Sequence, residues 1–179
     1  TPVQAFQFAS IYGFAMQDGR RLIRTAYLFV PRKFSKTTSS AAMAVYDMLF
    51  GDSNAQAYVG ANSYDQAKIC FDEIRAIMQD LDPSGRLFRV NREKVTFRKS
   101  GRDSLIQCLT ANAKTKDGLF ASLVIMDEYA QARNTAGKNG ADLKNVLTTS
   151  MGPRREPLTV IITTASDVID GPFAHELSG

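Results

Sequence analysis

The sequence predicts an α/β domain built on a mainly parallel β-sheet, and three observations lead to this prediction. Short apolar runs alternate with longer segments of helical periodicity, which is the pattern of strand–helix–strand units. The run 122–128 is continuously apolar until it ends in Asp127 and Glu128, as expected of a strand buried on both faces. The run 28–37 passes from an apolar strand through a basic loop into a helix. Ligands bind at the carboxyl ends of such strands, so both segments are predicted to lie at a binding site.

The segment 28–37 has the layout of a phosphate-binding P-loop. In such a loop, backbone N–H groups and the N-terminus of the helix face a phosphate chain. Lys36 would reach the outer phosphates, and the Thr37 hydroxyl would hold Mg²⁺. Val30 and Ser35 stand where the usual motif has glycines, so a basic surface loop before an amphipathic helix is an equally open interpretation of these residues alone.

The acidic pair Asp127–Glu128 supplies the chemistry that a P-loop lacks. Asp127 would hold Mg²⁺, directly or through water, and Glu128 would orient and activate an attacking water. The alternative is a strand followed by an acidic first turn of a helix, where carboxylates are favourable. The two motifs in this order favour a nucleotide hydrolase over either alternative.

Composition limits the remaining classes. The 179 residues are 44% hydrophobic and 22% charged, values typical of one ordinary globular domain. No signal peptide or membrane-length apolar run is visible, which predicts a cytosolic protein without a membrane partner. Cys70 and Cys108 lack metal or redox spacing, and the single His175 argues against a histidine metal cluster or a Ser-His-Asp triad. The net charge of +4 is compatible with a polyanionic partner but does not establish one.

In chain order, periodicity and turn residues predict the remaining elements. The first helix, within 1–20, carries an apolar stripe that includes Phe6, Ile11 and Phe14. The later elements are strand 25–30, helix 38–50, strand 56–60, a helix from 63 or 64 to 81, strands 87–99 and 104–110, helix 142–150, strand 158–164 and a helix starting at 173. The antiparallel pair is predicted to extend one sheet edge. Its cationic side chains favour a solvated, charge-protected edge over a contact with DNA or a neighbouring subunit: Arg86, Arg89, Arg92, Lys94, Arg98, Lys99 and Arg102.

Two further polar groups have open alternatives. The amides of Gln4 and Gln7 suit an adenine edge but also suit a surface. The hydroxyls of Thr163, Thr164 and Ser166 follow the last strand, where they would bond a γ-phosphate or its water, or cap the next segment.

Taken together, these motifs resemble the ATPase domain of the large terminase subunit of tailed bacteriophages, the motor that packages DNA into a capsid. The resemblance covers nearly the whole chain. It lies in the order and spacing of segments 2–6, 24–33, 65–67, 117–119 with 124–128, and 163–165.

This resemblance implies a RecA-like P-loop NTPase fold of the class with an extra catalytic glutamate. It makes Glu128 the catalytic glutamate, assisted by Lys36 and by Arg32, which matches a loop arginine of such motors. It implies ATP and Mg²⁺ as cofactors, with Thr37 and Asp127 as metal ligands. The implied nucleotide-binding residues are Gln4, at the adenine, and Pro31, Arg32, Lys33, Phe34, Ser35, Lys36 and Thr37. Thr163, Thr164 and Ala165 resemble the motif that couples hydrolysis to motion.

The family also implies partners and a setting. These are double-stranded DNA, a homo-oligomeric ring on a capsid portal, a small terminase subunit and the cytoplasm of an infected bacterial host. Residues 1–179 are expected to be a single ATPase domain excised from a longer chain, without the nuclease domain and nuclease activity that follow it in the family. The departure from the family is Phe34–Ser35, where a glycine is usual at the second position. A positive φ at Ser35 would cost on the order of 1 kcal/mol.

Three rival functions remain. Another DNA or RNA translocase or helicase of the same class would use the same site. A P-loop kinase for a small metabolite would need an acceptor pocket and a lid, and no arginine cluster after the last helix indicates one. The third rival is a DNA-binding or assembly subunit whose glycine-poor loop no longer turns over nucleotide. The leading hypothesis requires that Lys36 and the acidic pair meet at one triphosphate.

Overall fold

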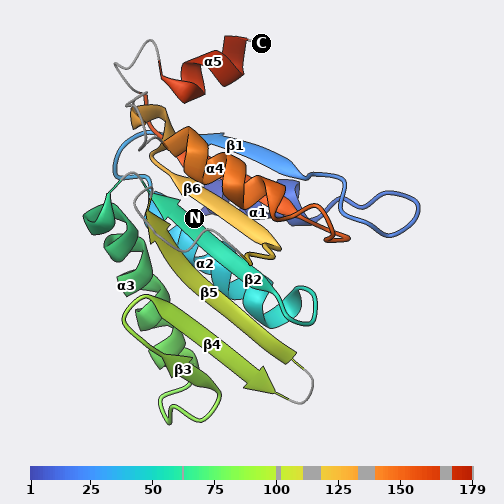
Figure 1. The fold of residues 1–179 in the computed structure, drawn as a ribbon, viewed down its shortest axis with the longest axis vertical. Coiled ribbons are helices and arrows are strands. Elements are labelled where there is room, and N and C mark those ends of the chain that lie inside the picture. The colour runs from blue at the N-terminus through green and yellow to red at the C-terminus, as the bar shows by residue number, and fades with distance from the viewer. Residues whose placement is uncertain (62, 100–101, 111–117, 133–139, 166–170, 179) are drawn as a thin grey trace.

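The computed structural model describes residues 1–61, 63–99, 102–110, 118–132, 140–165 and 171–178. Within these ranges it forms a seven-stranded sheet with the order β1-β7-β6-β2-β5-β4-β3 (Figure 1). The strands are β1 Thr25–Phe29, β2 Gln56–Ala61, β3 Phe88–Val90, β4 Lys94–Lys99, β5 Arg102–Thr110, β6 Leu123–Asp127 and β7 Leu158–Thr163. The helices are α1 Pro2–Tyr12, α2 Lys36–Phe50, α3 Tyr64–Leu81, the 3-10 turn η1 Tyr129–Gln131, α4 Gly140–Thr149 and α5 Pro172–Ser178. None of these helices is long and apolar enough to cross a membrane.

Five neighbouring strands of the sheet run parallel: β1, β7, β6, β2 and β5. Beyond β5, the strands β4 and β3 pair antiparallel and form one edge of the sheet. Phe29 at the end of β1 lies opposite Thr163 of β7, and Asp127 at the end of β6 lies opposite Ile162. The backbone N–H of Val30 donates to the carbonyl of Thr163 at 3.0 Å, and that of Glu128 donates to Ile162 at 2.9 Å. The segments that follow β1, β6 and β7 therefore leave the sheet side by side.

Helices cover both faces of the central strands, which explains why β6 and β7 are buried along their whole length. Successive residues of a strand point to opposite faces. Leu123 and Ile125 accordingly pack in one core with side chains of α2 and α3, whereas Val124 and Met126 pack in a second core with α4. Figure 1 shows α4 in front of the sheet and α2 behind it. The continuous apolar run around β6 is thus a consequence of this three-layer arrangement.

Two predicted boundaries change in the structure. Helix α2 begins at Lys36 rather than at 38, which puts the P-loop lysine and threonine in its first turn. The single strand predicted over 87–99 is wrong, because β3 and β4 pair antiparallel about a turn at 91–93. Both runs have strand-like composition, and periodicity alone does not locate so short a turn.

The apolar stripe predicted for the first helix is also partly wrong. Ile11 is buried, but Phe6 and Phe14 are 72% and 58% exposed. Helix α1 instead packs on α2 through Tyr12, whose ring centroid lies 4.8 Å from that of Tyr46. The helical period therefore identified a helix but not the face that it buries.

A buried arginine, Arg154, holds the amino ends of the parallel strands, at the end of the sheet opposite to Lys36 and Glu128. The guanidinium of Arg154 donates to the carbonyl oxygens of Asn54 at 2.7 Å and Phe120 at 2.6 Å, just before β2 and β6 begin. It also lies 3.9 Å from the centroid of the Phe120 ring. Nearby, the Ser122 hydroxyl donates to Asp47 of α2 at 2.6 Å. The amino ends of these strands are thus held by hydrogen bonds as well as by packing.

Replacing this arginine tests its structural role. Arg154→Ala leaves buried carbonyls without their donor, which should lower the free energy of unfolding by about 2–4 kcal/mol. Urea denaturation followed by circular dichroism measures the change. The exposed neighbour provides the control, since Arg155→Ala should stay within about 0.5 kcal/mol of wild type. Equal losses in the two variants would contradict the assignment.

Candidate functional site

The loop between β1 and α2 adopts P-loop-like backbone angles without a glycine. Ser35 immediately precedes α2 and has φ +52° and ψ +35°, in the left-handed region, and Lys33 has φ +63°. Left-handed backbone favours glycine because a Cβ atom is strained there, at a cost on the order of 1 kcal/mol. The serine therefore takes the conformation for which a glycine is usual, and the loop delivers Lys36 to the helix N-terminus.

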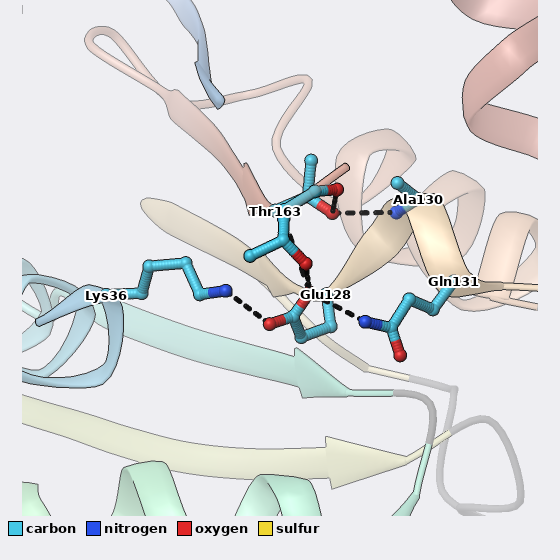
Figure 2. A network of polar contacts seen from close by, with 6 residues as sticks. Lys36, Glu128, Ala130, Gln131 and Thr163 are labelled. Atoms are coloured by element: carbon cyan, nitrogen blue, oxygen red, sulfur yellow. Dashed lines mark hydrogen bonds and ion pairs between the residues drawn. The ribbon is translucent and has the colours of Figure 1, made fainter. Parts of the chain in front are cut away.

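Lys36 and Glu128, 92 residues apart in the sequence, form a direct ion pair between Nζ and Oε1 (Figure 2). Their side chains are only 11% and 17% exposed. Charged groups this far from water interact more strongly than a surface pair. The P-loop lysine and the acidic pair thus meet at the carboxyl edge of the sheet, as the sequence predicted.

Glu128 sits at a sharp backbone turn and is oriented by several donors. Its φ of +53° turns the chain from β6 into η1. The second carboxylate oxygen, Oε2, accepts hydrogen bonds from the Thr164 hydroxyl at 3.0 Å and from the Gln131 amide at 3.2 Å. Burial alone would raise the pKa of Glu128, but the hydrogen bonds from Lys36 and Thr164 outweigh it and hold the pKa below its ordinary value. Glu128 is therefore an ionised carboxylate whose orientation is fixed by its hydrogen-bond donors.

Asp127 differs from its neighbour in carrying an unsatisfied acceptor. Its Oδ1 is buried and has no hydrogen-bond partner among the residues that the structure describes. Burial raises the pKa of Asp127 to about 6, the Glu128 carboxylate adds to the rise, and Lys36 opposes it. A buried carboxylate oxygen without a donor suits a bound cation.

The surroundings of Asp127 fit magnesium better than a metal held by the protein alone. The described residues contain no group of three or more His, Cys, Asp or Glu side chains able to hold a metal ion. Magnesium is commonly held by one or two protein oxygens together with phosphate oxygens and water. Asp127 supplies one such protein oxygen, and the second predicted ligand, Thr37, stands in the first turn of α2.

The predicted coupling residues divide between two tasks. The Thr164 hydroxyl bonds Glu128, but Thr163 turns to η1, where its hydroxyl accepts from the Ala130 N–H at 3.2 Å (Figure 2). Ala165 is exposed, and it has no polar side-chain contact with the other residues that the structure describes. Ser166 lies outside the described residues.

The remaining predicted nucleotide-binding residues lie near the loop without touching the acidic pair. The amide of Gln4 in α1 donates to the Ser39 hydroxyl of α2 at 3.3 Å, and its oxygen accepts from the N-terminus of Thr1. The other predicted nucleotide-binding residues of the loop ahead of α2 are exposed, as Ser35 is: Pro31, Arg32, Lys33 and Phe34. Among the described residues, Arg32 and Lys33 form no ion pair with Asp127 or Glu128. Their roles stay predictions.

Gln131 belongs to this site although no sequence motif marks it. A single 3-10 turn brings its amide back to Glu128, and one turn is too short to leave a periodic signal. The available signal was an amide side chain three positions after the predicted catalytic acid, which is the spacing at which neighbouring side chains on a turn can meet.

Comparison with known families and structures agrees with this geometry. The sequence model of the family "Terminase large subunit, ATPase domain" matches residues 2–178. The large terminase subunit of Enterobacteria phage HK97 is 27% identical over 172 residues, which cover 91% of this chain and 32% of that protein. The chain thus spans about a third of the length of this curated relative.

Solved structures show the same fold. The HK97 large terminase has a TM-score of 0.77 at 24% identity and covers 99% of this chain and 36% of its own. The ATPase domain of the Thermus phage P74-26 large terminase has a TM-score of 0.61 at 18% identity, covering 89% and 69%. A large terminase from a thermophilic bacteriophage in complex with ADP has a TM-score of 0.61 at 10% identity, covering 89% and 38%. At these identities the likeness concerns the fold.

The left-handed serine yields a prediction about stability. Ser35→Gly removes the strain of a Cβ at positive φ and should raise the free energy of unfolding by up to about 1 kcal/mol. Chemical denaturation of the nucleotide-free protein measures it. Ser53, an exposed turn residue outside the positive-φ set, is the control, because glycine there should lower stability by a few tenths of a kcal/mol, roughly. Destabilisation by Ser35→Gly would show that the loop is not strained.

The buried acid yields a prediction about pH. Because the folded-state pKa of Asp127 is about 6 and its ordinary value is 3.8, its contribution to stability is present below pH 4 and is lost as pH rises through 6. Without metal, the difference in free energy of unfolding between Asp127→Asn and wild type should therefore be more favourable to the variant at pH 7.5 than at pH 4, by about 2–3 kcal/mol. Urea denaturation in EDTA across pH 4–8 measures this. Asp80→Asn, at an exposed position of α3, serves as the control, and parallel curves for wild type and Asp127→Asn would refute the prediction.

Proposed function

The chain belongs to the family of terminase large-subunit ATPase domains, and on that premise we propose that it hydrolyses ATP to drive double-stranded DNA into a viral procapsid. The observation that carries the proposal is the ion pair between Lys36 and Glu128. It places the P-loop lysine and the acid best suited to activate water at one point of the sheet edge. The ADP complex of a structurally similar terminase supports a nucleotide as the ligand.

The ion pair implies a change of partner when ATP binds. The triphosphate carries more negative charge than one carboxylate, so Lys36 exchanges Glu128 for the β- and γ-phosphates. The exchange releases Glu128 Oε1, which can then accept a hydrogen bond from the attacking water. Phosphoryl transfer depends mainly on positioning and charge neutralisation, and Glu128 supplies the positioning of the nucleophile.

Asp127 and Thr37 are the residues proposed to hold Mg²⁺. The buried acceptor of Asp127 supports this role, because an unsatisfied carboxylate oxygen is costly unless a cation or donor occupies it. When bound, Mg²⁺ would neutralise phosphate charge during transfer. Ionising Asp127 for this task releases a proton, so Mg²⁺ affinity should rise with pH through about 6.

The partners proposed for the protein come from the family to which it belongs. An arginine is needed to neutralise charge in phosphoryl transfer, and Arg32 in the exposed loop is the candidate within this chain. A second arginine, supplied by a neighbouring copy, would explain assembly as a ring on a capsid portal. The other proposed partner is a small terminase subunit, and the proposed location is the cytoplasm of the infected host. Gln4 remains the proposed adenine contact. DNA is held through its phosphates, so binding should weaken with salt.

One observation favours a second candidate function, a DNA-binding or assembly subunit that does not hydrolyse ATP. Ser35 replaces the glycine of the P-loop motif, and Lys36 is already engaged by Glu128. Nucleotide binding must therefore compete with an internal carboxylate. The two functions differ in turnover, which a rate measurement separates.

The test is ATP hydrolysis over a range of protein concentrations, with and without duplex DNA. Glu128→Gln keeps the shape of the side chain but cannot act as a base, so the rate should fall at least about 100-fold while binding of a fluorescent ATP analogue persists. Lys36→Ala should lose the binding as well. Glu73→Gln in α3 is the matched control and should keep the wild-type rate.

The outcomes separate the two functions. A wild-type rate that vanishes in Glu128→Gln supports the ATPase. No rate in wild type at any concentration, together with intact DNA binding, favours the assembly subunit. A rate that survives in Glu128→Gln would remove Glu128 from the mechanism.

A further inference from the structure

Gln131 is the donor to Glu128 that no sequence motif accounts for. Its Nε2 lies 3.2 Å from Glu128 Oε2, on the side of the carboxylate away from Lys36 (Figure 2). The left-handed backbone at Glu128 bends the chain so that residue 131 returns toward residue 128. The backbone conformation therefore brings the Gln131 side chain close to Glu128.

The turn that carries Gln131 is firmly held. The Gln131 N–H donates to the Glu128 carbonyl at 3.0 Å, and the Ala130 N–H donates to Thr163 of β7 at 3.2 Å. Tyr129 is 1% exposed, and its hydroxyl donates to Glu176 of α5 at 2.8 Å. A donor on so constrained a turn keeps its place when a charge nearby moves.

The two oxygens of Glu128 thus have different kinds of partner. Oε1 is bound by the cation of Lys36, which a triphosphate attracts, whereas Oε2 is bound by the neutral donors Gln131 and Thr164, which it does not. When Lys36 leaves, the neutral donors still fix the plane of the carboxylate. Hydrogen bonds that orient the ligands of a metal site are commonly worth roughly 10- to 100-fold in activity, and we expect an effect at the lower end of that range for a carboxylate that orients water.

We infer that Gln131 is a positioning residue for hydrolysis, holding Glu128 Oε2 so that Oε1 faces the attacking water once Lys36 has moved to the phosphates. This inference rests on the proposed ATPase function. Gln131 acts through Glu128 and has no contact of its own with the reacting atoms. It should therefore affect turnover and leave nucleotide binding unchanged.

The experiment compares steady-state ATP hydrolysis of wild type, Gln131→Met and Gln131→Glu, with duplex DNA present. Methionine keeps the length of the side chain without a donor, and kcat should fall about tenfold with KM for ATP within about twofold of wild type. Glutamate places a second carboxylate against Glu128 and should lower kcat further. Gln79→Met, at an exposed position of α3, should match wild type.

A double variant shows that the effect passes through Glu128. Gln131→Met should slow wild type but cause no further loss in a Glu128→Gln background. Thermal unfolding should change little in Gln131→Met, which separates positioning from folding. A crystal structure with a non-hydrolysable ATP analogue should show the Gln131–Glu128 contact retained and the Lys36–Glu128 contact broken.

Each result decides something. Wild-type kcat in Gln131→Met, an unchanged kcat with raised KM, or loss of the Gln131–Glu128 contact in the analogue complex overturns the inference alone. Absence of hydrolysis in wild type overturns the proposed function, and the inference with it.

Discussion

The parallel register of β1, β7 and β6 is the constraint on which the site depends. It brings the segments after Phe29, Asp127 and Thr163 to the same end of the sheet, where backbone hydrogen bonds from Val30 and Glu128 to β7 fix their relative positions. Strands β6 and β7 are buried along their whole length, and a one-residue slip would move each of their side chains from one core to the core on the other face of the sheet. The meeting of Lys36 and Glu128 is a consequence of this register.

Within that frame, the two adjacent acids acquire different properties from their surroundings. Asp127 is buried with one carboxylate oxygen, Oδ1, unpaired among the described residues, and its pKa is raised, whereas Glu128 receives a cation and neutral donors, and its pKa is lowered. The surroundings thus favour the protonated form of Asp127 and the ionised form of Glu128. Under the proposed function, Asp127 would hold the cation and Glu128 would orient the water.

The sequence predicted the parts of this arrangement that have strong local signals. The apolar run before Asp127 and the basic loop before Lys36 were sufficient to place both at the carboxyl end of the parallel strands. It could not show that Phe6 is exposed, because the period of a helix does not reveal its partner. It missed the turn between β3 and β4 and the return of Gln131, since both depend on single residues whose conformation tertiary contacts decide.

The donors to Glu128 Oε2 come from the segments that follow two different strands. Gln131 follows β6, and Thr164 follows β7, so the orientation of the Glu128 carboxylate depends on the relative position of the ends of these two strands. Hydrogen bonds weaken steeply when donor and acceptor are misaligned. A small displacement of β6 relative to β7 would therefore rotate the Glu128 carboxylate away from its present orientation. Mechanical strain at this edge and the rate of the chemical step are thereby linked through one side chain.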